Sequence, residues 1–129
     1  TPLDIEARTA LSLGALEAGL AFSQTRTALA HALSYALTLD HDVPHGRAVA
    51  AWLPTACRLA AGCDAQIDRL LEEALDVDVD ACADALREWL QSLGISADPA
   101  SYGVMDAESR VKAALTSPRG RNFVGAPAA

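Results

Sequence analysis

The sequence is poor in aromatic residues, which make up 5% of its 129 positions. Any core must therefore be filled mainly by alanine and leucine, and this composition favours closely packed helices. Basic residues are fewer than acidic ones, 10 against 17, so the formal net charge is −7. No basic patch with interleaved aromatic residues is present. A surplus of negative charge disfavours binding to nucleic acid or to an anionic membrane surface. The hydrophobic content of 51% indicates a globular fold.

Other sequence features are missing as well. No apolar run is long enough for a membrane span, and the N-terminus lacks the layout of a signal peptide, so we expect a cytoplasmic location. The eight glycines include no GxGxxG or GGGS cluster, so no nucleotide-binding site is evident. The three cysteines form no CxxC pair, which disfavours a disulfide framework or a structural zinc site. Cys57 and Cys82 fall on apolar faces and are expected to be core residues.

The hydrophobic pattern predicts a single all-α domain, a bundle of about five to six helices. Pro54 is expected to kink one helix, because a proline ring clashes with the preceding turn. Gly14 and Gly19 suggest close helix contacts and hence a central first helix. The expected segments are a helix over 1–24, a site helix over 27–39, a kinked helix over 45–61, helices over 64–75, 80–93 and 106–116, and a mobile tail over 121–129.

The helix expected over 27–39 carries its hydrogen-bonding side chains on one face. With 3.6 residues per turn, positions i, i+4, i+7, i+8 and i+11 lie together. These positions are Thr27, His31, Ser34, Tyr35 and Thr38, and every other residue from Ala28 to Leu39 is alanine or leucine. A helix that is otherwise apolar all round belongs inside a protein, where a polar stripe needs partners, water, a ligand or a metal. We therefore expect this helix to line a site.

A second imidazole follows in the segment Val43-Pro44-His45-Gly46. Helical composition resumes at Arg47, so His45 should lie at or near a helix start. Two buried helices joined by a short loop would bring His31 and His45 to one point, which would make half of a metal site, since imidazole binds zinc, iron, copper and nickel. The alternative is an ordinary core histidine and an ordinary loop histidine. His41 is expected to be a solvated loop residue.

His31 and, fourteen positions later, the histidine of Pro44-His45-Gly46 resemble the signature of the iron-containing (group III, metal-dependent) alcohol dehydrogenases. The flanking segments 25–27, 31–35 and 43–50 resemble the phosphonoacetaldehyde reductase branch of that family. The resemblance covers nearly the whole chain and implies part of the family's helical C-terminal domain. It also implies that His31 and His45 are ligands of a catalytic divalent metal, Fe²⁺ or Zn²⁺.

The resemblance further implies roles for three neighbouring residues. Arg26, with Thr27, would bind the substrate, because the planar fork of an arginine suits a phosphonate group. The alternative for Arg26 is a solvated loop arginine. Tyr35 stands where many members of the family have a histidine assigned to proton relay, and its hydroxyl could donate a hydrogen bond to a carbonyl oxygen as a catalytic group. A structural hydroxyl bonded to the backbone is the competing interpretation of Tyr35.

Complete enzymes of this family also have an N-terminal nucleotide-binding domain, and the early helical domain adds an aspartate and another histidine to the metal. Neither is found in this sequence, so NAD(P)H would be bound only by a nucleotide-binding domain absent from this chain, and the metal would be weakly held. The implied function is reduction of phosphonoacetaldehyde or another small aldehyde, or oxidation of an alcohol. The alternative is a catalytically inactive interaction module or split subunit that needs a partner chain or forms a homo-oligomer.

Overall fold

The computed structural model describes residues 4–127, and within that range the regular elements are all helical. This confirms the all-α class predicted from the sequence. The helices are α1 (Ile5–Ser23), α2 (Leu29–Asp40), α3 (His45–Ala60), α4 (Ala65–Leu75), α5 (Val79–Ser92) and α6 (Ala107–Thr116), with short 3₁₀ helices η1 (Pro99–Tyr102) and η2 (Gly120–Asn122). The expected helix start at residues 1–3 and the last two residues of the expected tail lie outside the described residues.

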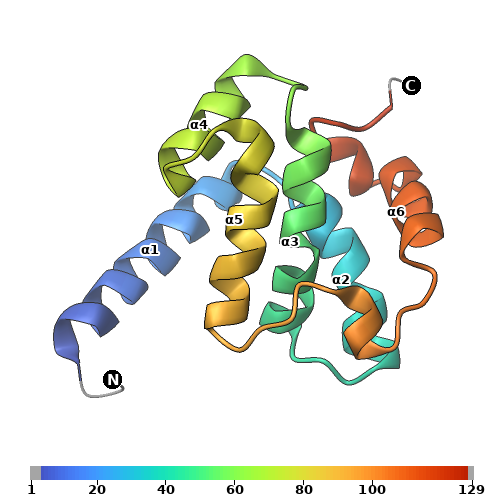
Figure 1. Cartoon of the computed structure of the whole chain (residues 1–129), viewed down its shortest axis with the longest axis horizontal. Coiled ribbons are helices and arrows are strands. Elements are labelled where there is room, and N and C mark those ends of the chain that lie inside the picture. The colour runs from blue at the N-terminus through green and yellow to red at the C-terminus, as the bar shows by residue number, and fades with distance from the viewer. Residues whose placement is uncertain (1–3, 128–129) are drawn as a thin grey trace.

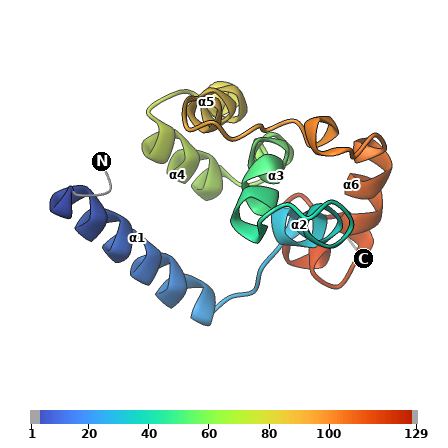
Figure 2. The same cartoon turned by 90° about the horizontal axis from the view of Figure 1, so that it is seen from below.

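Helices α2 and α3 form the centre of the molecule. Helix α5 packs against α3 on one side, α6 packs against α2 on the other, and α4 packs against α5 (Figures 1 and 2). Leucines spaced four residues apart on α2 meet small residues and one tryptophan of α3. This core contains Leu29, Leu33, Leu37, Ala48, Ala51 and Trp52. The alanines let the two helix backbones approach closely, and that approach determines how near their histidines can lie.

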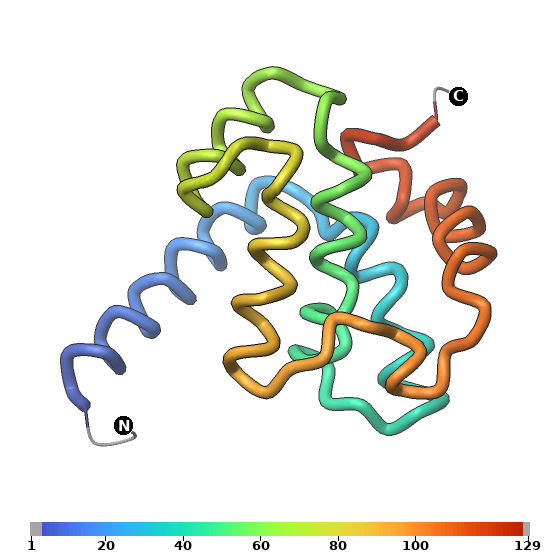
Figure 3. Tube along the Cα trace, in the orientation of Figure 1, coloured from blue at the N-terminus to red at the C-terminus, as the bar shows by residue number. Residues whose placement is uncertain are grey.

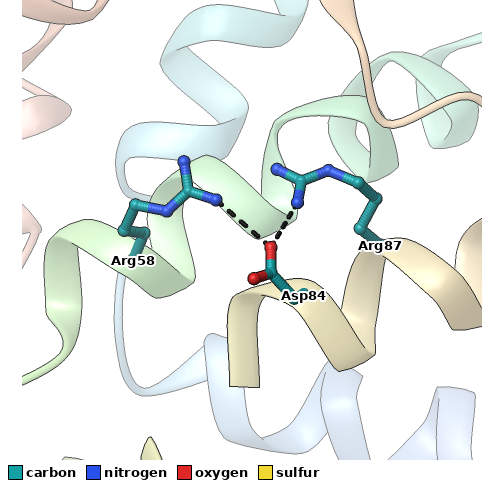
Figure 4. A network of polar contacts seen from close by, with 3 residues as sticks. All are labelled: Arg58, Asp84 and Arg87. Carbon is teal, nitrogen blue, oxygen red and sulfur yellow. Dashed lines mark hydrogen bonds and ion pairs between the residues drawn. The ribbon is translucent and has the colours of Figure 1, made fainter. Parts of the chain in front are cut away.

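A second buried cluster joins α3 to α5. It contains Cys57, Cys82 and Ala83, so the prediction that both cysteines are core residues is confirmed. On the surface of the same helix pair, Asp84 accepts from the guanidinium groups of Arg58 on α3 and Arg87 on α5 (Figure 4). Such exposed ion pairs contribute little, about 0–1 kcal/mol. The α3–α5 contact therefore depends mainly on apolar packing.

Helix α3 begins at His45, directly after Pro44, as the sequence predicted. The loop before it is fixed by a hydrogen bond from the Val43 N–H to the Leu37 carbonyl at 3.1 Å. The helix then continues through Pro54, which is buried. A proline without an N–H interrupts one backbone hydrogen bond but does not end the helix here. The result is a long α3 with a histidine at its first position.

Helix α1 extends away from the rest of the molecule, as the tube in Figure 3 makes clear. None of its residues is buried. Its large apolar side chains are between 54% and 74% exposed: Ile5, Leu11, Leu13, Leu16, Leu20 and Phe22. A Cβ added at Gly14 or Gly19 would meet nothing within 4 Å. The expectation that these glycines place the first helix in a central, closely packed position is therefore wrong for this structure. None of the helices within residues 4–127 is long and apolar enough to cross a membrane.

Candidate functional site

His31 and His45 lie side by side where α2 and α3 pack together. His31 is in the first turn of α2, and His45 is the first residue of α3. Their ring centroids are 5.4 Å apart and their planes are inclined by 66°. The loop of residues 41–44 and the packing of α2 on α3 bring the two rings to one place, as the polar stripe of the sequence suggested.

The spacing of the two rings fits a shared metal ion. Two imidazoles bound to one tetrahedral ion through bonds of about 2.0–2.1 Å would have ring centroids about 5 Å apart. The same spacing also suits an edge-on aromatic contact. No group of three or more histidine, cysteine, aspartate or glutamate residues that could hold a metal is found within residues 4–127. The described part of the chain therefore brings two imidazoles together without a complete coordination shell around them, and the prediction that His31 and His45 bind a metal stays a prediction.

The electrostatic surroundings of His31 favour its neutral form. Burial, the neighbouring His45 and the Arg119 guanidinium, in that order of size, hold the pKa of His31 below its usual value. A neutral imidazole is the form that binds metals, because a protonated ring has no free nitrogen lone pair. The lowered pKa therefore widens the pH range in which His31 has a free nitrogen lone pair.

Tyr35 lies one helical turn beyond His31 and belongs to the same group of side chains. Its ring centroid is 6.2 Å from that of His45. Its hydroxyl makes no hydrogen bond to another residue in the described range 4–127, so a structural bond from Tyr35 to the backbone is not observed. The hydroxyl remains available to a bound molecule, and its predicted catalytic role stays a prediction.

Arg119 completes the group and was not identified from the sequence. Its guanidinium carbon lies 4.8 Å from the centroid of the Tyr35 ring, a cation–π contact. At an exposed position such contacts stabilise by about 0.5–1 kcal/mol. In the sequence, Ser117-Pro118-Arg119-Gly120 has only the composition of a helix end, because proline and glycine commonly follow a helix. The local sequence gave no signal that this arginine faces the histidines.

The turn that carries Arg119 is firmly attached to the body. The Gly120 N–H donates to the Ser117 hydroxyl at 3.0 Å, and the Asn122 amide donates to the Thr27 carbonyl at 3.3 Å. Phe123 packs against the main core. Within the described range, the segment expected to be mobile from residue 121 thus makes specific contacts just before α2 begins.

The structure does not bring every predicted site residue to the histidines. Arg26 lies exposed in the linker between α1 and α2, and no ion pair or hydrogen bond of its side chain to another residue of range 4–127 is found. Thr27 is half-buried and contributes its carbonyl to the Asn122 bond. The predicted substrate-binding roles of both remain predictions. His41 is exposed as expected, although a Cβ at Gly103 would lie 2.9 Å from its ring.

Two other members of the polar stripe turn towards the protein interior. Ser34 is fully buried, and its hydroxyl donates to the His31 carbonyl at 2.9 Å. The hydroxyl of Thr38 is buried without a hydrogen-bond partner in the described residues. The stripe therefore divides into His31 and Tyr35, which face His45 and Arg119, and two hydroxyl residues that belong to the helix contact.

Comparison with known families gives one match. The model of the C-terminal domain of the Fe-containing alcohol dehydrogenase family matches residues 1–127. No curated protein and no solved structure matches the chain.

Proposed function

The chain belongs to the Fe-containing alcohol dehydrogenase family, as a C-terminal domain, and from this premise we propose that it is the metal-binding part of a metal-dependent alcohol dehydrogenase or aldehyde reductase. The single observation that carries the proposal is the 5.4 Å separation of the His31 and His45 rings. Two imidazoles at this spacing fit one divalent ion.

In this proposal His31 and His45 hold Fe²⁺ or Zn²⁺ through neutral ring nitrogens. The bound metal would act as a Lewis acid for a carbonyl oxygen. Further ligands would come from outside the described residues, because an ion bound by two imidazoles alone is weakly held. Tyr35 would donate a hydrogen bond from its free hydroxyl to the substrate oxygen.

The hydride donor would be NAD(P)H, bound by another domain or chain. The sequence has no glycine-rich phosphate-binding segment that could hold a dinucleotide. The chain would then supply the metal ligands and part of the substrate pocket. The finer proposal for the substrate is phosphonoacetaldehyde, reduced to 2-hydroxyethylphosphonate. It is supported by the resemblance of the segments around Arg26, His31 and His45 to that branch of the family.

A metal titration of the purified chain tests the proposal. Co²⁺ is a suitable probe because its visible absorption reports nitrogen coordination, and it binds where Zn²⁺ or Fe²⁺ does. We expect His31→Ala and His45→Ala each to weaken Co²⁺ binding by about tenfold or more, since each removes one of two ligands. His41→Ala is the matched control, because it removes an exposed imidazole from the adjoining loop. Co²⁺ affinity that does not depend on His31 or His45 would exclude the metal-binding proposal.

A second candidate function is favoured by the exposure of α1. This helix carries six large apolar side chains that are 54% to 74% exposed: Ile5, Leu11, Leu13, Leu16, Leu20 and Phe22. Exposed apolar side chains gathered on one element favour association with a partner. In this candidate the chain associates with a second copy or with a nucleotide-binding partner through α1. Association that persists in the metal-free protein and in His31→Ala would support this candidate over a purely catalytic role.

A further inference from the structure

Arg119 is a positive charge next to the histidine pair, and it has no acidic partner among residues 4–127. The ion pairs found in the described range 4–127 join Arg58 and Arg87 to Asp84, and Arg110 to Asp106. Arg119 is in none of them, although the chain as a whole carries a net charge of −7. Its guanidinium lies instead over the face of the Tyr35 ring. The hydrogen-bond donors on its edges are therefore available to a ligand.

The surface around Arg119 is hollowed. A cavity of about 400 Å³ is lined by Ala32, Tyr35, Ser117, Pro118 and Arg119. The Ser117 hydroxyl is already engaged, because it donates to the Ala114 carbonyl and accepts from the Gly120 N–H. Among these lining residues, Arg119 alone carries a charge. The chemistry of the cavity therefore favours a small ligand with a negative group and an otherwise apolar body.

The position of Arg119 is fixed before any ligand arrives. The turn of residues 117–123 is hydrogen-bonded internally, and Asn122 ties it to Thr27 at the start of α2. The guanidinium carbon also lies 4.8 Å from the centroid of the Tyr35 ring. A side chain that already makes such a contact loses less conformational freedom on binding, and the planar fork of an arginine can donate two parallel hydrogen bonds to one oxyanion group.

We propose that Arg119 binds the oxyanion group of an anionic substrate, a phosphonate or a carboxylate, beside the His31–His45 pair. The assignment of that anion to a substrate rests on the function proposed above. The centroid of the Tyr35 ring lies 4.8 Å from the Arg119 guanidinium carbon and 6.2 Å from the His45 ring centroid. Arg119 and His45 are therefore both neighbours of the Tyr35 side chain. In this proposal, one small bifunctional molecule would place its anionic end in the cavity at Arg119 and its carbonyl at the neighbouring histidines.

Anion titrations of the metal-free chain at low ionic strength test this proposal. The probes are inorganic phosphate and methylphosphonate, followed by the NMR shift of the Arg119 Nε–H group and by calorimetry. We expect Arg119→Ala to weaken binding of both probes about tenfold or more, because a hydrogen-bonded charge pair is lost. The anion affinity of Arg119→Lys should lie between those of the wild type and Arg119→Ala, since lysine keeps the charge but lacks the planar fork of arginine.

Arg121→Ala is the matched control, because it removes the same charge from the same turn. We expect it to change the affinity less than twofold. Equal weakening by Arg121→Ala would show a general charge effect and overturn the proposal, as would an unchanged affinity in Arg119→Ala or no anion binding by the wild-type chain. Loss of binding in Arg26→Ala with retention in Arg119→Ala would instead assign the anion to the linker arginine and also overturn it. Far-UV circular dichroism and the midpoint of urea unfolding establish that each variant is folded.

The same titrations separate a substrate group from free phosphate. Methylphosphonate binding at least as tightly as inorganic phosphate supports a substrate group, because its methyl carbon stands for the rest of the molecule. A tenfold preference for inorganic phosphate overturns the substrate assignment. Dimethyl methylphosphonate, which has no charge, should not bind. Because the anion titrations use the metal-free chain and the Co²⁺ titration uses no anion, a failed Co²⁺ titration and a failed anion titration remain distinguishable.

Discussion

Replacing Gly120 by alanine should destabilise the protein by disrupting the turn that carries Arg119. A Cβ at this position would lie 1.8 Å from the Ala114 carbonyl oxygen and 2.7 Å from its carbon. These are backbone atoms of α6, so they cannot rotate away as the end of a side chain could. To relieve the clash, the turn must move by more than 1 Å, and this movement would loosen the Asn122–Thr27 hydrogen bond and the packing of Phe123.

The expected loss in the free energy of unfolding is about 2–3 kcal/mol. Overpacking alone typically costs about 1–3 kcal/mol, and loss of the exposed Asn122–Thr27 hydrogen bond adds about 0.5 kcal/mol. Urea unfolding followed by circular dichroism measures this loss. Anion binding through Arg119 should weaken in parallel, because the guanidinium would leave the Tyr35 ring.

Gly46→Ala is the control for this prediction. It is the same substitution, but a Cβ at Gly46 in the first turn of α3 would meet nothing within 4 Å. It should stabilise the protein slightly, by about 0.5–1 kcal/mol, because alanine has less conformational freedom to lose than glycine. If Gly120→Ala proves as stable as Gly46→Ala, the close packing of η2 on α6 is refuted.

Three further predictions follow from burial and charge. Burial raises the pKa of the Cys57 and Cys82 thiols, so iodoacetamide should alkylate the exposed Cys63 in the folded protein and all three cysteines only in urea; equal labelling of all three without urea would contradict this. Folding lowers the pKa of His31. The stabilising contribution of His31 is therefore present above the unfolded pKa of about 6.5 and is lost as the pH falls through the folded value. On acidification, the urea midpoint should drop less in His31→Asn than in the wild type. Leu16→Glu on α1 should reduce self-association in light-scattering measurements with little change in the unfolding free energy, since Leu16 is 58% exposed in the single chain; unchanged association would rule out this face of α1 as the interface.

Local sequence patterns were sufficient for the helices, whereas for the histidine pair they left two interpretations open and the family resemblance favoured a shared site. Apolar positions with the 3.6-residue period of a helix placed the helical segments, and the Pro44-His45 sequence marked the start of α3. His45 directly follows the short loop, whereas His31 lies in the first turn of α2. Their convergence therefore depends on the packing of α2 against α3, which the local pattern suggests only in outline.

The remaining features depend on contacts that the local sequence does not encode. The position of Arg119 is determined by the bond from Asn122 to Thr27, whose partners lie 95 residues apart in the chain. Gly14 and Gly19 suggested close helix contacts for α1, but a Cβ at either position would meet nothing within 4 Å, and the local pattern does not say which surface covers this helix. In the structure, no residue of α1 is buried by residues 24–127, so the expected central position of this helix is wrong.

The hydrogen bond between Asn122 and Thr27 brings the last turn of the body next to the start of α2, the first helix of the core. Helix α1 precedes this point and lies outside the packed body. Circular permutation, which joins neighbouring termini and opens the chain elsewhere, should therefore be tolerated by the segment from Thr27 to Phe123. Helix α1 could be replaced by another docking element while His31, His45 and Arg119 keep their mutual positions.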